Sequence, residues 1–512
     1  MGILEQYSES LYYSGYKAIR NKFRNYHPMQ LLALLLDYLN HPAKDELEEL
    51  KKHPWLILLL IKWIFTDECF EQPGKRNVSN DQVMGLLQKM LDLRAVCRMP
   101  SQYAHHSLFF RNIGFQQFIF QHRLGLHFFG RQAILFACER NGRYYNDQFV
   151  SVTGVSIKRF IDLMYLLMTR FVVPEQSGDY HRDVSLRWFS IVFERYPAVE
   201  VKRFLDSMAV DYLEIRRRLL EMDNGRRQCQ EQYEHTPFIR FPLIKKDETY
   251  LCVYPLVLYR SMEHFIYNTL RGLDPEGFMR RFGPTFERYV EKTLIHSKLT
   301  FATEIELMTA LAGEGRVIDF LVADGDTNVF IDAKAVEMTY QGKVTHSADI
   351  LRNRTKDSIL KAIEQAYETS YRLSMTRSNN PVIQFRNKAF IVVITYREMY
   401  LGTGKTFYEA VAGEKINELQ GKYPSEVHIP MENIYFLTIE DFDLYCEGVR
   451  SQAIGFVEGF ERAKLLDADP VTRKFDFYLH LRSLGIETPP SYLIDAVDNF
   501  LKEIAEVLGD EV

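Results

Sequence analysis

Two short apolar segments, residues 317–323 and 329–336, limit the folds open to this chain more than any other feature of its 512 residues. Both are rich in Val, Ile, Phe and Ala, and the five residues between them include Gly, Asp and Asn. This pattern predicts two strands joined by a hairpin loop. Because both segments are apolar on both faces, we expect helices to cover the sheet.

The elements around this hairpin follow a regular order. A helix is expected from Pro284 to residue 294, because proline is favoured in a first helical turn and apolar residues then recur at helical spacing. Three strands, a second helix and a further strand are expected at 301–307, 317–323, 329–336, 358–373 and 389–395. The order is αβββαβ, and a strand at 434–438 is expected to extend a mixed central sheet.

The first 230 residues have apolar residues at three- and four-residue spacing, which predicts a mainly helical region. The longest apolar run, residues 55–65, is interrupted by Lys62 and has about half the length that crosses a bilayer, so we expect a buried helix and no membrane partner. Residues 149–167 fit either a DNA-reading helix-turn-helix unit or an ordinary helical hairpin. Basic residues at 216–218 and 226–227 fit either phosphate binding or a solvated helix face.

A chain of this length exceeds one hydrophobic core, so several folding units are expected. We place a helical recognition or partner region at 1–230 and a connector with a hairpin and helix at 231–275. The sheet domain is expected at 276–445, followed by a C-terminal helical extension at 446–512. The expected fold class is therefore α+β or α/β, with a mostly helical N-terminal region.

Charge and cysteine content exclude several classes of protein. With 63 Lys and Arg against 68 Asp and Glu, the net charge is -5, so a nucleic-acid partner would have to be held by local basic patches. The six cysteines form no C-x-x-C pair, which argues against a zinc site and a disulfide framework. Residues 1–5 lack the pattern of a secretory signal, so we expect a cytoplasmic protein.

The hairpin carries charged residues where apolar ones would be expected. Asp332 and Lys334 project to the same face of one strand, and Asp319 lies in the neighbouring strand. Ionised groups are costly in such a place unless they are paired or bind a metal. Asp319 and Asp332 would offer hard oxygen ligands to Mg²⁺ or Mn²⁺, and Lys334 could orient the attacking water and offset developing negative charge. The pattern favours phosphodiester hydrolysis.

These residues, with Glu287 on the preceding helix and the αβββαβ order, resemble the PD-(D/E)xK superfamily of restriction-endonuclease-like nucleases. The resemblance covers about residues 280–440, and Ile318 stands where the family name has proline. It implies that Asp319, Asp332 and Glu287 bind the metal and that Lys334 serves catalysis. It also implies that a polar residue of the helix after the motif reaches the active site, and Gln365 is the candidate.

Plainer interpretations of these residues remain open. Asp332 and Lys334 could form a surface ion pair on an edge strand, and Gln365 could lie on a solvated helix face. Glu287 could be a solvated residue near a helix start, with Glu304 and Glu306, expected on the first strand, as competing ligands. A basic loop and one further lysine are candidates for nucleic-acid binding or for an ordinary surface: Lys343, Arg352, Arg354 and Lys356.

The resemblance implies a metal-dependent nuclease that acts on DNA more than on RNA, in the setting of prokaryotic restriction or antiphage defence. The alternatives are a nucleic-acid-binding or scaffold protein that keeps the fold without cleavage, and an RNA-cleaving toxin. The helical N-terminal region would then recognise a protein partner, the substrate or a second copy of the chain.

Overall fold

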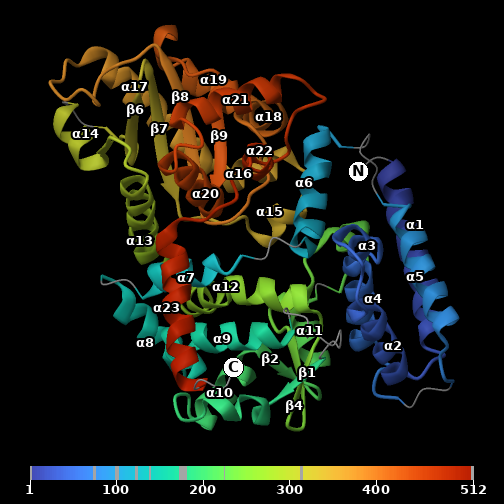
Figure 1. Ribbon diagram of the computed structural model, residues 1–512. Helices are drawn as coiled ribbons and strands as arrows, with labels where there is room; N and C mark the ends of the chain where they lie inside the picture. The colour runs from blue at the N-terminus through green and yellow to red at the C-terminus, as the bar shows by residue number, and fades with distance from the viewer. Residues whose placement is uncertain are drawn as a thin grey trace. The chain divides into compact units, whose positions relative to one another are not determined.

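The computed structural model describes residues 3–72, 76–97, 103–121, 125–137, 140–171, 182–223, 225–311 and 315–508. By its contacts the chain divides into two compact units (Figure 1). The first comprises residues 1–102, 113–274 and 495–512, and the second comprises 103–112 and 275–494. The described residues are mainly helical and form two small mixed sheets, which confirms the expected α+β class.

The first unit is built mostly from helices. These are α1 (Ile3–Phe23), α2 (Pro28–Asn40), α3 (Glu46–Lys51), α4 (Pro54–Thr66), α5 (Asn80–Arg94), α7 (His127–Phe136), α8 (Gly142–Thr153), α9 (Ile157–Phe171), α10 (Ala198–Met208), α11 (Ile215–Met222) and α12 (Pro255–Leu273). Short 3₁₀ turns lie at Phe118–Phe120, Leu186–Val192, Cys229–Tyr233 and Pro237–Ile239. Two further helices, α6 (His106–Gln117) and α23 (Ser491–Leu508), contribute residues to both units.

A four-stranded sheet completes the first unit, in the order β1 (Asp183–Ser185), β4 (Thr249–Cys252), β3 (Leu243–Lys246) and β2 (Ala209–Asp211). The hairpin expected within residues 231–275 is confirmed, because β3 and β4 pair antiparallel. Its tight turn places Asp247 at φ 55°, a conformation that Asp adopts more readily than most residues. The strand begins only at Leu243, because Pro237–Ile239 forms a 3₁₀ turn.

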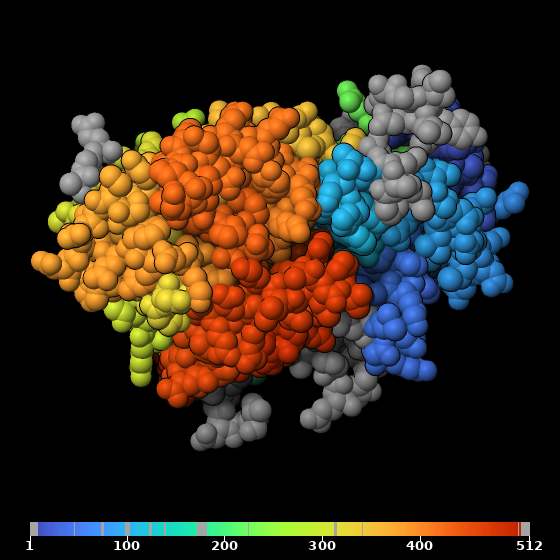
Figure 2. Space-filling model, turned by 90° about the horizontal axis from the view of Figure 1, so that it is seen from above, coloured from blue at the N-terminus to red at the C-terminus, as the bar shows by residue number. Residues whose placement is uncertain are grey.

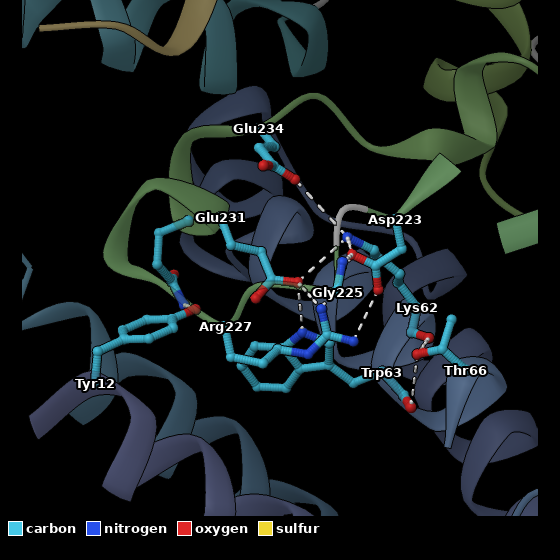
Figure 3. A network of polar contacts seen from close by, with 10 residues as sticks. Tyr12, Lys62, Trp63, Thr66, Asp223, Gly225, Arg227, Glu231 and Glu234 are labelled. Carbon is cyan, nitrogen blue, oxygen red and sulfur yellow. Dashed lines mark hydrogen bonds and ion pairs between the residues drawn. The ribbon is translucent and has the colours of Figure 1, made fainter. Parts of the chain in front are cut away.

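Helix α4 is buried along its whole length, as expected from its apolar sequence. Lys62 is only 6% exposed, and its Nζ lies 3.2 Å from Glu231 Oε1, 3.6 Å from Asp223 Oδ1 and 3.8 Å from Glu234 Oε2 (Figure 3). An ammonium group can be buried only with such partners. The residue that interrupts the apolar run therefore anchors α4 to the segment after α11. None of the helices in the described part of the chain has the length and apolar character needed to cross a membrane.

Arg227 joins the same network, so this part of the expected basic cluster is internal. Its Nη2 donates to Asp223 Oδ2 at 2.8 Å and its Nη1 to Glu231 Oε1 at 3.1 Å (Figure 3). Arg227 is thus engaged by two carboxylates and is not displayed to a phosphate backbone. The possible DNA-reading helix, α9, is also a core element, with nine of its residues from Ile157 to Phe171 buried.

The second unit carries the larger sheet, in the order β5 (Phe301–Thr303), β6 (Phe320–Asp324), β7 (Thr327–Lys334), β8 (Lys388–Thr395) and β9 (Ile434–Thr438). Strands β5, β6 and β7 pair antiparallel, whereas β7, β8 and β9 pair parallel. Strand β9 coincides with its expected range. In the view of Figure 2, the surface of this unit is formed largely by residues coloured orange to red, so the chain after β7 covers this face.

The helices of this unit are α13 (Pro275–His296), α14 (Glu304–Ala310), α15 (Tyr340–Val344), α16 (Ala348–Thr355), α17 (Lys361–Met375), α18 (Gly404–Phe407), α19 (Gly413–Gln420), α20 (Ile439–Arg450), α21 (Phe456–Ala468) and α22 (Phe477–Ser483). Two π-helical turns, Lys356–Leu360 and Tyr408–Ala412, precede α17 and α19, and 3₁₀ turns lie at Ser425–Val427 and Met431–Asn433. Helices α13 and α17 both pack against β7.

Three local expectations for this unit were wrong. The helix expected from Pro284 begins at Pro275 and continues through Pro284, because Phe278, Phe282 and Phe286 form one buried stripe that outweighs the missing backbone hydrogen bond. The strand expected at 301–307 ends at Thr303, which caps α14 instead. The strand expected from residue 317 begins at Phe320.

Candidate active site and metal centre

The two aspartates of the hairpin meet at one end of the β6–β7 pair. Asp319 directly precedes β6, and the register pairs Phe320 with Ile331, which places Asp319 next to Asp332. The backbone N–H of Ala333 donates to Asp319 Oδ2 at 2.7 Å and holds that carboxylate in place. Asp332 is fully buried. A surface ion pair on an edge strand was therefore the wrong alternative, because β7 lies in the middle of the sheet.

Lys334 links the aspartates to α17. Its Nζ lies 2.5 Å from Asp332 Oδ1 and donates to Gln365 Oε1 at 3.1 Å. The amide of Gln365 in turn donates to the carbonyl oxygen of Val317 at 2.8 Å, which fixes its orientation. Gln365 is 8% exposed, so the solvated-face alternative was wrong for this residue. The structure brings the lysine and the glutamine predicted for the site into direct contact.

Two glutamates complete the cluster. One carboxylate oxygen each of Glu287, on α13, and Glu304, on α14, lies within 4.8 Å of an oxygen of Asp319 and of the other glutamate. All three residues are half-buried. The sequence left Glu287 and Glu304 as alternative metal ligands. In the structure both carboxylates lie beside Asp319.

The position of Glu304 is set by a helix start that the sequence contains. Thr303 Oγ1 accepts a hydrogen bond from the Glu306 backbone, and the Glu306 carboxylate accepts one from the Thr303 backbone at 2.8 Å. This capping box begins a helix where β-strand continuation was expected. The Thr-x-x-Glu spacing at residues 303–306 was the signal that could have shown it. It turns Glu306 into a capping residue and leaves Glu304 to face the cluster.

The carboxylates of the site repel one another. Burial, and then the charge of Asp332, raises the pKa of Asp319 to about 8, although Lys334 opposes the shift. Burial also raises the pKa of Asp332, against the opposing charges of Lys334 and Lys361. The pKa of Glu287 is raised by burial and by nearby acids, of which Glu304 contributes most. The cluster therefore binds protons tightly, and a cation that kept its carboxylates ionised would remove that repulsion.

The residues predicted to bind nucleic acid differ from one another in burial and in hydrogen-bond partners. The expected loop at 352–356 is helical, because Ser347 caps α16 by accepting from the Ile350 backbone. Arg352 is half-buried, and its Nε donates to the Val411 carbonyl at 3.0 Å while its Nη1 donates to Asp349 Oδ1 at 2.9 Å. Arg354 is exposed and donates to Gln341 Oε1 at 2.8 Å, and Lys356 is exposed at the start of the π-helical turn.

Lys343, the fourth of these residues, lies in α15 and is half-buried. Its backbone carbonyl accepts a hydrogen bond from the buried Arg111 at 3.3 Å. Of the predicted nucleic-acid residues, Arg354 and Lys356 thus present the most accessible charge. Their role in binding stays a prediction.

Comparisons of the chain with protein-family models, with curated proteins and with solved structures found no match. Function is therefore inferred from the residues of the site.

Proposed function

We propose that the second unit is a metal-dependent nuclease that hydrolyses phosphodiester bonds, with DNA as the expected substrate. The observation that carries the proposal is the convergence of Asp319, which directly precedes β6, of Asp332 and Lys334 on β7, and of Gln365 on α17. These are the residues that the resemblance to PD-(D/E)xK nucleases implies. Burying several acids with raised pKa values beside a single lysine also lowers the stability of the folded protein. Such a cost is typical of a functional site.

The residues fit a divalent cation. Carboxylate oxygens of Glu287, Glu304 and Asp319 lie within 4.8 Å of one another, close to the about 4 Å span of two Mg²⁺–oxygen bonds. Only oxygen ligands are offered, which favours Mg²⁺ or Mn²⁺ over softer metals. Asp332 is the further ligand that the resemblance implies. When bound, the cation would supply Lewis-acid activation of the scissile phosphate and of water.

The side chains of the chain have separate tasks in this proposal. Lys334 places a positive charge beside the carboxylates, where it stabilises the negative charge that develops on the phosphate. Gln365 holds the Lys334 ammonium by accepting its hydrogen bond and is itself fixed by Val317. The backbone of Ala333 orients Asp319. Gln365 is thus a positioning residue, because it acts through Lys334.

The test is cleavage of supercoiled plasmid, single-stranded DNA and RNA by purified protein with Mg²⁺ or Mn²⁺. We expect Asp332→Asn to lower the cleavage rate by at least about 100-fold, the order found when one electrostatic catalytic group is removed. The matched control is Asp326→Asn, because Asp326 lies in the turn of the same hairpin and is exposed. Equal cleavage by wild type and Asp332→Asn would refute the proposal.

A further inference from the structure

Helix α17 brings a second lysine to the candidate active site. Lys361 is the first residue of α17, and Gln365, one turn later, lies on the same side of the helix. Gln365 accepts a hydrogen bond from Lys334 Nζ at 3.1 Å, so this side of α17 faces the site. Helix α17 also packs against β7, which carries Asp332 and Lys334 (Figure 1). Helical periodicity therefore places Lys361 on the side of α17 that faces the carboxylate cluster.

The electrostatics of Asp332 agree with this placement. Burial raises the pKa of Asp332, and the charges of Lys334 and Lys361 oppose that rise. The Lys361 ammonium thus acts on a carboxylate of the site without forming an ion pair with it.

Lys361 forms no ion pair or side-chain hydrogen bond within the part of the chain that the structure describes. The acidic residues that follow it along α17 have other partners. Glu364 forms an ion pair with Lys422 at 2.7 Å, and Glu368 accepts a hydrogen bond from Tyr423 at 2.9 Å. The Lys361 side chain is half-buried beside the site, and its ammonium is available to an anion from outside the chain.

Without a further cation, a substrate phosphate would meet net negative charge at this site. One bound Mg²⁺ and Lys334 supply three positive charges against four carboxylates, which are those of Glu287, Glu304, Asp319 and Asp332. The Lys334 ammonium is also engaged already by Asp332 and Gln365. Lys361 adds a fourth positive charge, and its N–H donors can form charge-assisted hydrogen bonds to phosphate oxygens.

We propose that Lys361 binds a backbone phosphate of the nucleic acid at the candidate active site. This inference rests on the proposed nuclease function and gives Lys361 a role separate from that of Lys334. Lys334 stabilises charge that develops during the reaction, whereas Lys361 contributes to substrate binding. A phosphate contact carries no sequence information, so its contribution depends on salt concentration and not on base sequence.

The test measures the salt dependence of binding by fluorescence anisotropy. The probes are a duplex DNA 30-mer, the single DNA strand and an RNA of the same sequence, with Mg²⁺ and with Asp332→Asn in every protein. Adding Lys361→Ala should weaken binding about tenfold, as expected for a lost hydrogen bond to a charged group. It should reduce the slope of log affinity against log salt by about 0.9 for the duplex and about 0.7 for single strands. Lys361→Arg should restore both quantities, because arginine also binds phosphate.

The matched control is Lys388→Ala, which removes the same charge elsewhere on the sheet. Lys388 is exposed at the start of β8, beside Thr327, whereas Lys334 lies beside Thr395 at the other end of the same strand pair. Its ammonium pairs with Asp326 at 3.0 Å. The two ends are about 23 Å apart, which exceeds the Debye length of about 10 Å at 0.1 M salt. This substitution should leave the affinity and the slope unchanged.

An unchanged affinity and slope in the Lys361→Ala protein would overturn the inference, and so would an equal change in the Lys388→Ala protein. Failure of Lys361→Arg to restore binding would overturn it too, because the lysine would then serve packing. Cleavage by the protein with Asp332 intact tests the nuclease function separately. Cleavage with an unchanged slope would keep that function and remove the role of Lys361, whereas a reduced slope without cleavage would refute the function and keep Lys361 as a phosphate-binding residue. Absence of binding to all three probes would overturn both.

Discussion

Replacement of Asp319 by Asn should make the metal-free protein more stable. The pKa of Asp319 is raised from 3.8 to about 8, chiefly by burial and by Asp332. The folded state therefore binds a proton that the unfolded state releases above pH 4, so stability falls as pH rises from about 4 to about 8. At pH 7 this penalty has an upper limit of about 4 kcal/mol, at about 1.4 kcal/mol for each pH unit.

The measured gain should be smaller than this limit for two reasons. Asp319 is partly exposed, and the neighbouring Asp332, whose pKa is also raised, can hold the proton in its place. We expect about 1–2 kcal/mol, which corresponds to a rise in melting temperature of about 2–8 °C for a unit of this size. Asparagine keeps the shape of the side chain, and its oxygen can still accept the hydrogen bond from Ala333. The gain should be smaller at pH 5 than at pH 8.

The assay is thermal unfolding followed by circular dichroism in EDTA at several pH values. All three tryptophans, Trp55, Trp63 and Trp188, lie in the first unit, so their fluorescence serves as an internal control that should not change. Added Mn²⁺ should stabilise the wild type, by about 2.7 kcal/mol at 100 times its dissociation constant, and the variant much less. An Asp319→Asn protein that is less stable than wild type in EDTA, or a difference that does not depend on pH, would refute the reasoning.

Three further predictions concern single side chains. Lys334→Met should slow DNA cleavage by at least about 100-fold while anisotropy shows retained DNA binding; an equal loss of affinity would make Lys334 a binding residue. Glu304→Gln should weaken Mn²⁺ binding, measured by calorimetry, whereas Glu306→Gln should affect it less; equal effects would contradict a ligand role for Glu304. Lys62→Ala should lower the free energy of unfolding by up to about 3–5 kcal/mol, seen by Trp63 fluorescence in urea, because Glu234 loses this cation and Asp223 and Glu231 keep only Arg227. A neutral effect would contradict this account.

Much of the local structure could be predicted from short-range pattern. Strand β9 was expected at the residues it occupies, and β8 differs from its expected range only by Lys388. The buried helix α4 was expected from its apolar run. Periodicity and turn residues are properties of neighbouring positions, so they can be read without knowledge of the fold. The errors at Pro284 and Thr303 arose where a buried stripe or a cap outweighed a local preference.

In the candidate site too, some features follow from the local sequence and others only from the packing of distant segments. Sequence pattern alone determined that Asp319, Asp332 and Lys334 belong to one hairpin, because pairing across a short loop limits their separation. Only the tertiary structure decided that Gln365, 31 residues after Lys334, orients its ammonium, and that Glu287 and Glu304 share one place. It also decided that Lys62 meets Glu231, 169 residues away. Contacts of this kind depend on how helices pack on a sheet or on one another, and that packing is set by the whole buried surface and not by any short segment.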